Sequence, residues 1–333
     1  MNIKEIATLA NTSPASVSRV INSSGYVKEE VRQRVQKILD DTGYRPNAFA
    51  KALHSKKSHT IGVILPKINA TSSSDNVLGI DEYFSAKGYS LLLANTNHSL
   101  EKELEFLDVF KQKQVDGIIL IATELTKAHQ QAFAKLAIPL VIMGQTSLDD
   151  TPCVLFDETQ AAYCMTEYLI EHGHQRIAFI GVDERDIAVG QCRKQGYLNA
   201  LQAHNLVICD EYYAQGDFTP EGGYKACQQI IQTSSALPHA LFAANDKMAI
   251  GAINYLMEQN IRVPEQISVC GVGGGLLAQY YNPKLTTLFY DYKQSGMIAA
   301  QTLYRLIHGD KNTEPRQFVP HQLVVSDSTR SVR

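Results

Sequence analysis

Residues 11–35 read NTSPASVSRVINSSGYVKEEVRQRV, and a short helix with a break on either side can be recognised in them. Ser13 suits the N-cap position of such a helix, and Pro14 suits its first turn. Val17 and Val20 follow with the spacing of one apolar helix face. The stretch therefore predicts a helix whose apolar side packs against neighbouring elements.

The sequence before and after this stretch supplies two more helices. Ile3 and Ile6 begin an apolar helical pattern over residues 3–10. A third pattern covers residues 28–42, and Gly43 is its expected stop. Two short helices joined by a tight turn and braced by a third form a helix-turn-helix unit.

The outward face of the second helix is small and polar, as expected of a helix that enters a DNA groove. An arginine can pair with guanine through two hydrogen bonds, and a small apolar side chain can meet a thymine methyl group. Serine and asparagine suit phosphate oxygens. A purely structural three-helix bundle with a polar face is the alternative. The candidate DNA contacts are Pro14, Ala15, Ser16, Ser18, Arg19, Asn22 and Tyr26.

Positive charge is concentrated in the same part of the chain. Residues 1–58 carry ten Lys or Arg and five Asp or Glu, a net charge of +5, whereas the whole chain of 333 residues carries −3. A basic N-terminal part on an acidic remainder favours a polyanionic partner for that part alone.

Bulk composition narrows the class of protein. Hydrophobic residues make up 44% of the chain and charged residues 20%, which is typical of a globular protein. No apolar run reaches the roughly 18 residues of a membrane helix, and Lys4 and Glu5 stand where a signal peptide has its apolar core. We therefore expect a cytoplasmic protein without a membrane partner. The six cysteines are scattered without a Cys-x-x-Cys pair, so neither zinc nor a disulfide framework is expected.

From residue 60 onward, short apolar runs alternate with amphipathic helical stretches. TIGVILP, SLLLANT, DGIILIA and PLVIMG read as buried parallel strands of a first series. RIAFIGV, ALFAAN and ISVCGV belong to a second series. Two such series predict an α/β body of two doubly wound lobes with parallel sheets.

Motifs along essentially the whole chain resemble the lactose-repressor (LacI/GalR) family of bacterial transcriptional regulators. The matching segments are VSRVIN, GYRPN, DGIIL, GHQRIAFIG, ANDKMAIGA, ISVCGVG and PKLTT. The resemblance implies a helix-turn-helix domain, then a hinge helix with linker, then a periplasmic-binding-protein-like body for effector binding and dimerisation. The expected limits are 1–45, 46–59 and 60–333, with lobe 1 over 60–157 and 291–318 and lobe 2 over 160–288 and 320–329. Crossings between the lobes are expected near 157–160, 288–291 and 318–320.

The segment RPNAFAKALHS, residues 45–55, is the expected hinge helix. A helix of about two turns is marginal in water, so it should fold only when something packs on it. In the resembling family two such helices pair in the minor groove, and a leucine wedges into the central base step. Leu53 occupies that place and Asn47 can cap the helix, so both join the candidate DNA contacts. Packing of Leu53 against the body is the alternative.

The cleft between the lobes is the expected effector site, because ligands bind beyond the carboxyl ends of strands in open α/β sheets. The resemblance implies sugar contacts, by hydrogen bonding or ring stacking, for Arg193, Phe218, Asn245 and Tyr292. Asp246 is expected to cap a helix rather than bind ligand. The full candidate set is Asn69, Ser72, Ser73, Asp157, Arg193, Phe218, Asn245 and Tyr292.

Three positions depart from the family pattern. Lys28 stands where the family usually has a serine, so the third helix should lack its cap. Gly144 and Gly273 stand where many sugar-responsive members have an aspartate. Losing two carboxylates should enlarge the pocket and remove repulsion of an anion. The expected effector is a disaccharide or a sugar phosphate, as in the sucrose- and trehalose-operon branch, which other segments resemble; a monosaccharide or a purine is the alternative.

Other classes of protein fit less well. A transport-linked sugar-binding protein would need a signal peptide and no helix-turn-helix. GVGGG at 271–275 lacks the spacing of a nucleotide loop, and EHGH at 171–174 offers too few ligands for a metal. An architectural DNA binder would leave the large body unexplained.

The sequence thus predicts a transcriptional regulator, and more narrowly a repressor, of a sugar-utilisation operon. It is expected to be no enzyme and to need no cofactor or metal. A sugar-type effector would control operator affinity, by induction or co-repression, if it binds two states unequally. The expected partners are pseudo-palindromic operator DNA and a second copy in a homodimer. LVVSDSTRSVR, at the C-terminal end, lacks the apolar heptads of a tetramer-forming helix.

Overall fold

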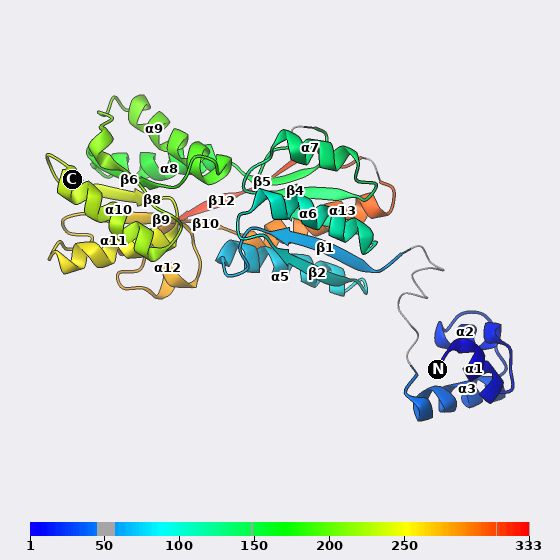
Figure 1. Cartoon of the computed structure of the whole chain (residues 1–333). Helices are drawn as coiled ribbons and strands as arrows, with labels where there is room; N and C mark the ends of the chain where they lie inside the picture. Colours follow the sequence, from blue (N-terminus) through cyan, green and yellow to red (C-terminus); the bar gives the residue numbers. More distant parts are fainter. Residues whose placement is uncertain (45–56, 148, 311, 333) are drawn as a thin grey trace. The chain divides into compact units, whose positions relative to one another are not determined.

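The computed structural model describes residues 1–44, 57–147, 149–310 and 312–332. The chain divides into two compact units, which we call the helical unit (residues 1–59) and the two-lobed unit (residues 60–333) (Figure 1). The predicted hinge residues Asn47 and Leu53 lie outside the described residues.

Three helices lie within residues 1–44 of the helical unit, as predicted: α1 (Ile3–Leu9), α2 (Pro14–Ile21) and α3 (Glu29–Thr42). Ser13 caps α2, because its Oγ accepts a hydrogen bond from the Ser16 amide at 3.1 Å. Gly43 follows α3 with a φ of 60°, a left-handed conformation that glycine adopts at little cost. Lys28 gives α3 no side-chain cap, which confirms the expectation for that position.

One apolar core joins the three helices. Its buried side chains are Ile6, Ala7, Ala10, Val17, Val20 and Val35. Because this core takes the apolar stripe of α2, the opposite, polar stripe of α2 is left to solvent.

The two-lobed unit contains two six-stranded sheets. The strands of the first are β1 (Thr60–Leu65), β2 (Ser90–Asn95), β3 (Gly117–Ile121), β4 (Leu140–Met143), β5 (Cys153–Phe156) and β11 (Arg316–Val319). Those of the second are β6 (Ile177–Gly181), β7 (Tyr213–Gln215), β8 (Ala240–Ala243), β9 (Ser268–Gly273), β10 (Thr286–Tyr290) and β12 (His321–Val324).

The strand orders are β11-β5-β4-β3-β1-β2 and β12-β10-β9-β8-β6-β7. Neighbouring strands are parallel except β10 and β12, which are antiparallel. The predicted α/β class with two doubly wound lobes is confirmed. We call the lobe of the first sheet lobe 1 and that of the second sheet lobe 2.

Helices cover both faces of each sheet (Figure 1). In lobe 1 they are α5 (Thr71–Ser85) and α13 (Tyr292–Ile307) on one face, and α6 (Leu100–Gln112) and α7 (Lys127–Ala134) on the other. In lobe 2 they are α8 (Glu158–Glu171), the π-helix η1 (Ile187–Cys192), α9 (Arg193–Ala203), the 3-10 helix η2 (Asp210–Tyr212), α10 (Pro220–Thr233), α11 (Asp246–Glu258) and α12 (Leu276–Tyr280). None of the described helices combines the length and the apolar character that a membrane span requires.

The chain passes between the lobes three times. β5 leads into α8 at Asp157, β10 leads into α13 at Asp291, and β11 leads into β12 at Pro320. These positions fall within the three windows expected from the sequence. The strands that carry the crossings lie toward one edge of each sheet, and β2 and β7 form the opposite edges.

One prediction about burial is wrong. SLLLANT forms β2, but β2 is an edge strand, and Leu92 and Leu93 are 37% and 42% exposed. An edge strand has a neighbour on one side only, so its apolar run overstates how much of it is covered.

Candidate functional site

The solvent-facing side of α2 carries the predicted DNA contacts. Its exposed members are Pro14, Ala15, Arg19, Asn22 and Tyr26, and its half-buried members are Ser16 and Ser18. Tyr26 has 85% of its surface exposed. A partner that approaches this side therefore meets an exposed cation and an exposed ring.

Some of these side chains form hydrogen bonds at the ends of α2, whereas Arg19 is placed differently. The Ser13 and Ser16 hydroxyls are 3.0 Å apart, and the Asn22 amide donates to the Ser18 carbonyl at 3.0 Å. These bonds fix the two ends of α2. Arg19 instead runs its methylene groups past Gly25, where an added Cβ would lie 3.5 Å from the Arg19 Cδ. The Arg19 side chain is thus supported along its stem and exposed as a whole.

In the two-lobed unit, Arg193 is the centre of a buried polar network. It is the first residue of α9 and only 4% exposed. Its guanidinium donates to both carboxylate oxygens of Glu158, from Nε at 2.7 Å and from Nη2 at 3.0 Å. Nη1 donates to the Ala244 carbonyl. The Tyr290 hydroxyl donates to the same Glu158 carboxylate at 2.6 Å, so the ion pair is held from several elements.

A π-helix leads into Arg193. Asp186 caps this π-helix, because its carboxylate accepts a hydrogen bond from the Val189 amide at 3.0 Å. Gly190 within it approaches the preceding loop so closely that a Cβ would lie 2.3 Å from the Asp183 carbonyl oxygen. π-Helical turns are frequent at functional sites, and this one sets where the Arg193 side chain begins.

Three aromatic rings meet where the chain crosses between the lobes. Phe156, at the end of β5, stacks on Tyr290, at the end of β10, with centroids 4.2 Å apart and planes within 11°. Tyr292 contacts both rings edge-on. The Tyr290 ring centroid also lies 5.4 Å from the guanidinium carbon of Arg193, so the rings and the ion pair form one cluster.

Asn245 and Phe218, both predicted effector contacts, lie together in lobe 2. Asn245 caps α11 by accepting from the Met248 amide at 2.8 Å, and its Nδ2 donates to the Phe218 carbonyl at 3.1 Å. Phe218 is half-buried with a φ of 69°, a left-handed conformation that is uncommon for an aromatic residue. The prediction that Asp246 caps this helix is wrong, because Asn245 occupies the cap.

Asp246 instead turns toward the loop that follows β9. It is buried, and it accepts hydrogen bonds from the Gly274 amide at 2.7 Å and the Thr287 hydroxyl at 2.6 Å. Burial raises the pKa of Asp246 to about 6, against the lowering effect of these bonds. Burial likewise raises the pKa of Asp186 to about 6. Two carboxyl groups that interact with Arg193 therefore titrate just below neutral pH.

The structure gives the two glycines at the aspartate positions a reason of their own. Gly144 and Gly273 have φ values of 82° and 137°, which favour glycine, and a Cβ at Gly273 would lie 2.9 Å from an oxygen of Asp246. Both glycines thus answer a backbone requirement. Glu158 and Asp246 supply carboxylates beside the guanidinium, so an anion gains no advantage there.

The remaining predicted effector residues follow the ends of β1 and β5. Asn69 lies in an exposed turn, and Ser72 and Ser73 lie in the first turn of α5, half-buried and buried respectively. Asp157 is exposed and caps α8 by accepting from the Gln160 amide at 2.9 Å. These four residues stay predictions as ligand contacts.

Sequence reasoning misses Glu158 and Tyr290. Each stands within two residues of a predicted contact, in LFDET and LFYDY, at the carboxyl end of a strand. The rule that selected Asp157 and Tyr292 could have found them. The rule did not select them, because the sequence alone does not distinguish a side chain that pairs with a neighbour from one that binds a ligand.

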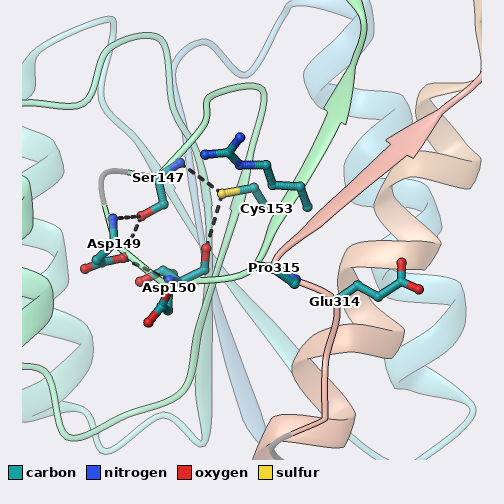
Figure 2. A pocket seen from close by; sticks show the side chains of 8 residues that line it. Ser147, Asp149, Asp150, Cys153, Glu314 and Pro315 are labelled. Atoms are coloured by element: carbon teal, nitrogen blue, oxygen red, sulfur yellow. Dashed lines mark hydrogen bonds between the residues drawn. The ribbon is translucent and has the colours of Figure 1, made fainter.

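The structure also holds an open cavity of about 440 Å³ at the other end of lobe 1 (Figure 2). Its lining residues are Ser147, Asp149, Asp150, Thr151, Cys153, Glu314, Pro315 and Arg316. Because β5 and β11 begin there and the crossings leave from their carboxyl ends, this cavity is separate from the predicted effector site. Burial raises the pKa of the Cys153 thiol, and its sulfur accepts from the Ser147 amide at 3.1 Å, so the thiol stays protonated and structural.

Comparisons with known proteins match both units. Residues 2–47 match the model of the lacI family of bacterial regulatory proteins, and residues 166–329 match a periplasmic binding protein-like domain. The sucrose operon repressor of Staphylococcus xylosus is 32% identical over 92% of this chain and 93% of its own. The transcriptional repressor PurR of Vibrio atlanticus is 34% identical over 98% of each chain. The lac repressor dimer bound to operator and an anti-inducer shares the fold, with a TM-score of 0.90 and 24% identity over 99% of each chain.

Proposed function

The chain belongs to the lacI family of bacterial regulatory proteins, and from this premise we propose that it represses a sugar-utilisation operon in the cytoplasm, bound as a homodimer to a pseudo-palindromic operator. It is a transcriptional repressor and not an enzyme. In the proposal α2 reads the operator: Arg19 pairs with a base, and Ser16 and Ser18 contact phosphates. The exposed polar face of α2, with the cation of Arg19 on it, supports this assignment.

The proposed effector is an uncharged sugar, of disaccharide size, in the cleft of the two-lobed unit. The observation that carries this choice is the buried Arg193–Glu158 ion pair. Its charges cancel, so the centre of the network attracts neither a free anion nor a free cation. A sugar phosphate would have to bring its negative charge close to Glu158 and Asp246, and like charges at such a site repel. An uncharged sugar avoids that cost.

The polar groups of the network match sugar hydroxyls, which both donate and accept hydrogen bonds. A guanidinium has five N–H donors. Glu158, Ala244 and Tyr292 engage four of those of Arg193, so a donor remains for a hydroxyl oxygen. Phe218 offers a ring for the apolar face of a pyranose. Asn245 holds the Phe218 backbone and thereby positions that ring.

Effector control follows from the position of this network between two lobes. A ligand that binds one arrangement of the lobes more tightly than the other shifts the equilibrium between them. Operator affinity changes only by the free energy of that preference. In the proposal, sugar binding stabilises an arrangement of the lobes that weakens operator binding.

The experiment has two steps. Selection from a random DNA library with the full chain should yield a two-fold symmetric sequence, and fluorescence anisotropy then gives its affinity. Sucrose, trehalose, their 6-phosphates and hypoxanthine are then added one at a time to the protein–operator complex. We expect a disaccharide to lower operator affinity and its phosphate to have the weaker effect.

Two outcomes contradict the proposal at different points. An unsymmetrical selected sequence, or none, argues against the homodimeric repressor. A response to hypoxanthine or only to a 6-phosphate keeps the repressor and rejects the uncharged sugar.

A further inference from the structure

A pair of rings joins the lobes on the side away from the crossings. The crossings involve strands at one edge of each sheet, whereas β2 and β7 form the opposite edges. His98 follows β2 in lobe 1, and Phe218 follows β7 in lobe 2. Their ring centroids are 6.4 Å apart, and their planes are within 10° of parallel. The two side chains therefore face each other across the unit's two lobes.

Both rings sit on strained backbone. His98 has a φ of 60° and Phe218 a φ of 69°, the left-handed region that residues with a Cβ rarely adopt. Such conformations cost about 1–3 kcal/mol each and persist only where the surroundings enforce them, most often at functional sites. Here two such residues place rings from different lobes against each other, and this arrangement calls for a functional explanation.

Hydrogen bonds on each side enforce these conformations. In lobe 1 the His98 amide donates to the Pro66 carbonyl at 3.0 Å, which ties the loop after β2 to the loop after β1. In lobe 2 the Phe218 carbonyl accepts from Asn245 at 3.1 Å, and the Asp217 carboxylate accepts from the Thr219 amide at 3.1 Å. Each ring is held by its own lobe, so the contact between them depends on how the lobes sit.

We propose that His98 and Phe218 form a latch that stabilises the closed arrangement of the two lobes, and that His98 is thereby a determinant of effector affinity. The inference rests on the proposed function. The lobes are connected at the crossings, so opening displaces the far edges most. In lobe 1, β5 and β2 are four strand spacings of about 4.8 Å apart, a lever of roughly 19 Å. A small rotation at the crossings is enough to part the rings.

The latch also gives Phe218 a second role. As a predicted sugar contact it lies on the lobe 2 side of the cleft, and the latch couples this contact to closure. A ligand that packs on Phe218 in the closed arrangement gains from the ring pair without touching His98. Aromatic pairs contribute enough to change an affinity by roughly 2- to 12-fold.

The chain contains no tryptophan, which permits a direct optical test on the full-length protein. Phe218→Trp places a single tryptophan at the latch, where contact with a protonated imidazole quenches its emission. Because burial lowers the pKa of His98, the comparison is made at acidic pH, where the ring is charged. In that protein we compare His98 with His98→Asn, because asparagine tolerates a left-handed φ while removing the ring. His204→Asn, at the C-terminal end of α9, is the matched control.

We expect His98→Asn to raise the tryptophan emission and His204→Asn to leave it unchanged. Equal emission in all three proteins shows that the rings do not meet in solution and overturns the latch, whatever the effector proves to be.

The second measurement uses native Phe218 and the sugar that proves active in the operator assay. We expect His98→Asn to weaken its binding by roughly 2- to 12-fold and His98→Phe to restore it. Operator affinity without sugar should not change. Tighter sugar binding by His98→Asn overturns the latch, because the ring pair would then oppose closure. If no sugar binds the wild-type protein, the proposed effector class fails, and the fluorescence comparison still decides the latch.

Discussion

The polar face of α2 and the polar network of the two-lobed unit hold their functional side chains in opposite ways. Arg19 on α2 and Tyr26 in the segment after it are exposed, and each can meet a partner independently. In the network, Arg193 is buried, and Glu158 neutralises it. The chemistry of an exposed side chain depends mainly on its residue type. The chemistry of a buried side chain depends on its neighbours. Substitutions should therefore act locally on α2 and cooperatively in the network.

The largest expected effect comes from breaking the buried ion pair. Glu158→Ala leaves the guanidinium of Arg193 buried without its counter-charge, and loss of one partner of a buried pair costs about 3–5 kcal/mol. Urea unfolding of the full chain measures this loss. Asp183→Ala is the control, because its pair with Arg185 is exposed to solvent and should contribute little to stability. Equal losses of unfolding free energy in the two variants would contradict the expected difference between buried and exposed ion pairs.

The next effect is a pH dependence that an exposed carboxyl group would not show. The pKa of Asp246 rises to about 6 in the folded protein from 3.8. The folded state therefore binds more protons than the unfolded state between these values, and stability from this group is lost as pH rises through 6. The full change is about 3 kcal/mol.

Unfolding free energies measured from pH 4 to 8 test this for wild type and Asp246→Asn. Relative to Asp246→Asn, the unfolding free energy of wild type should decrease as pH rises. Asparagine also alters the hydrogen bonds to Gly274 and Thr287, so the slope with pH carries the test and the offset does not. Parallel curves would show that burial does not control this carboxyl group.

On α2 the expected effect is smaller and confined to one base pair. Arg19→Ala should lose about 1–3 kcal/mol of discrimination at a single position in each half-site. Ser18→Ala is the matched comparison and should weaken binding evenly across sequences, because a phosphate contact carries no base information. Repeating the DNA selection with each variant measures both. An unchanged consensus for Arg19→Ala would remove it as a base reader.

The same contrast explains how far the sequence could predict the molecule. The three helices were predictable because Ser13, Gly43 and the apolar spacing act within a few residues. The strands followed from runs of apolar residues, and the crossings followed from the resemblance to a known family. The pairing of Glu158 with Tyr290 was not predictable, because 132 positions separate them and only the two sheets bring them together. The exposed side of β2 was missed for the same reason, since strand order decides which strand is an edge.

The smallest expected effect sharpens the claim that local signals govern the helical unit. Ser13 caps α2, whereas Lys28 gives α3 no side-chain cap and places a cation at a helix N-terminus, where the helix dipole disfavours it. Lys28→Ser supplies a hydroxyl to the first-turn amides and should stabilise α3 by about 0.5–1 kcal/mol. Hydrogen exchange of the α3 amides in the full chain measures the gain, and Ser13→Ala should produce a loss of similar size in α2. Nothing in the two-lobed unit should respond to either change. Two results would contradict this expectation: slower hydrogen exchange around Arg193 in Lys28→Ser, or unchanged exchange in α3. Either would show that local caps do not govern the helical unit. Its difference from the buried network would then need another cause.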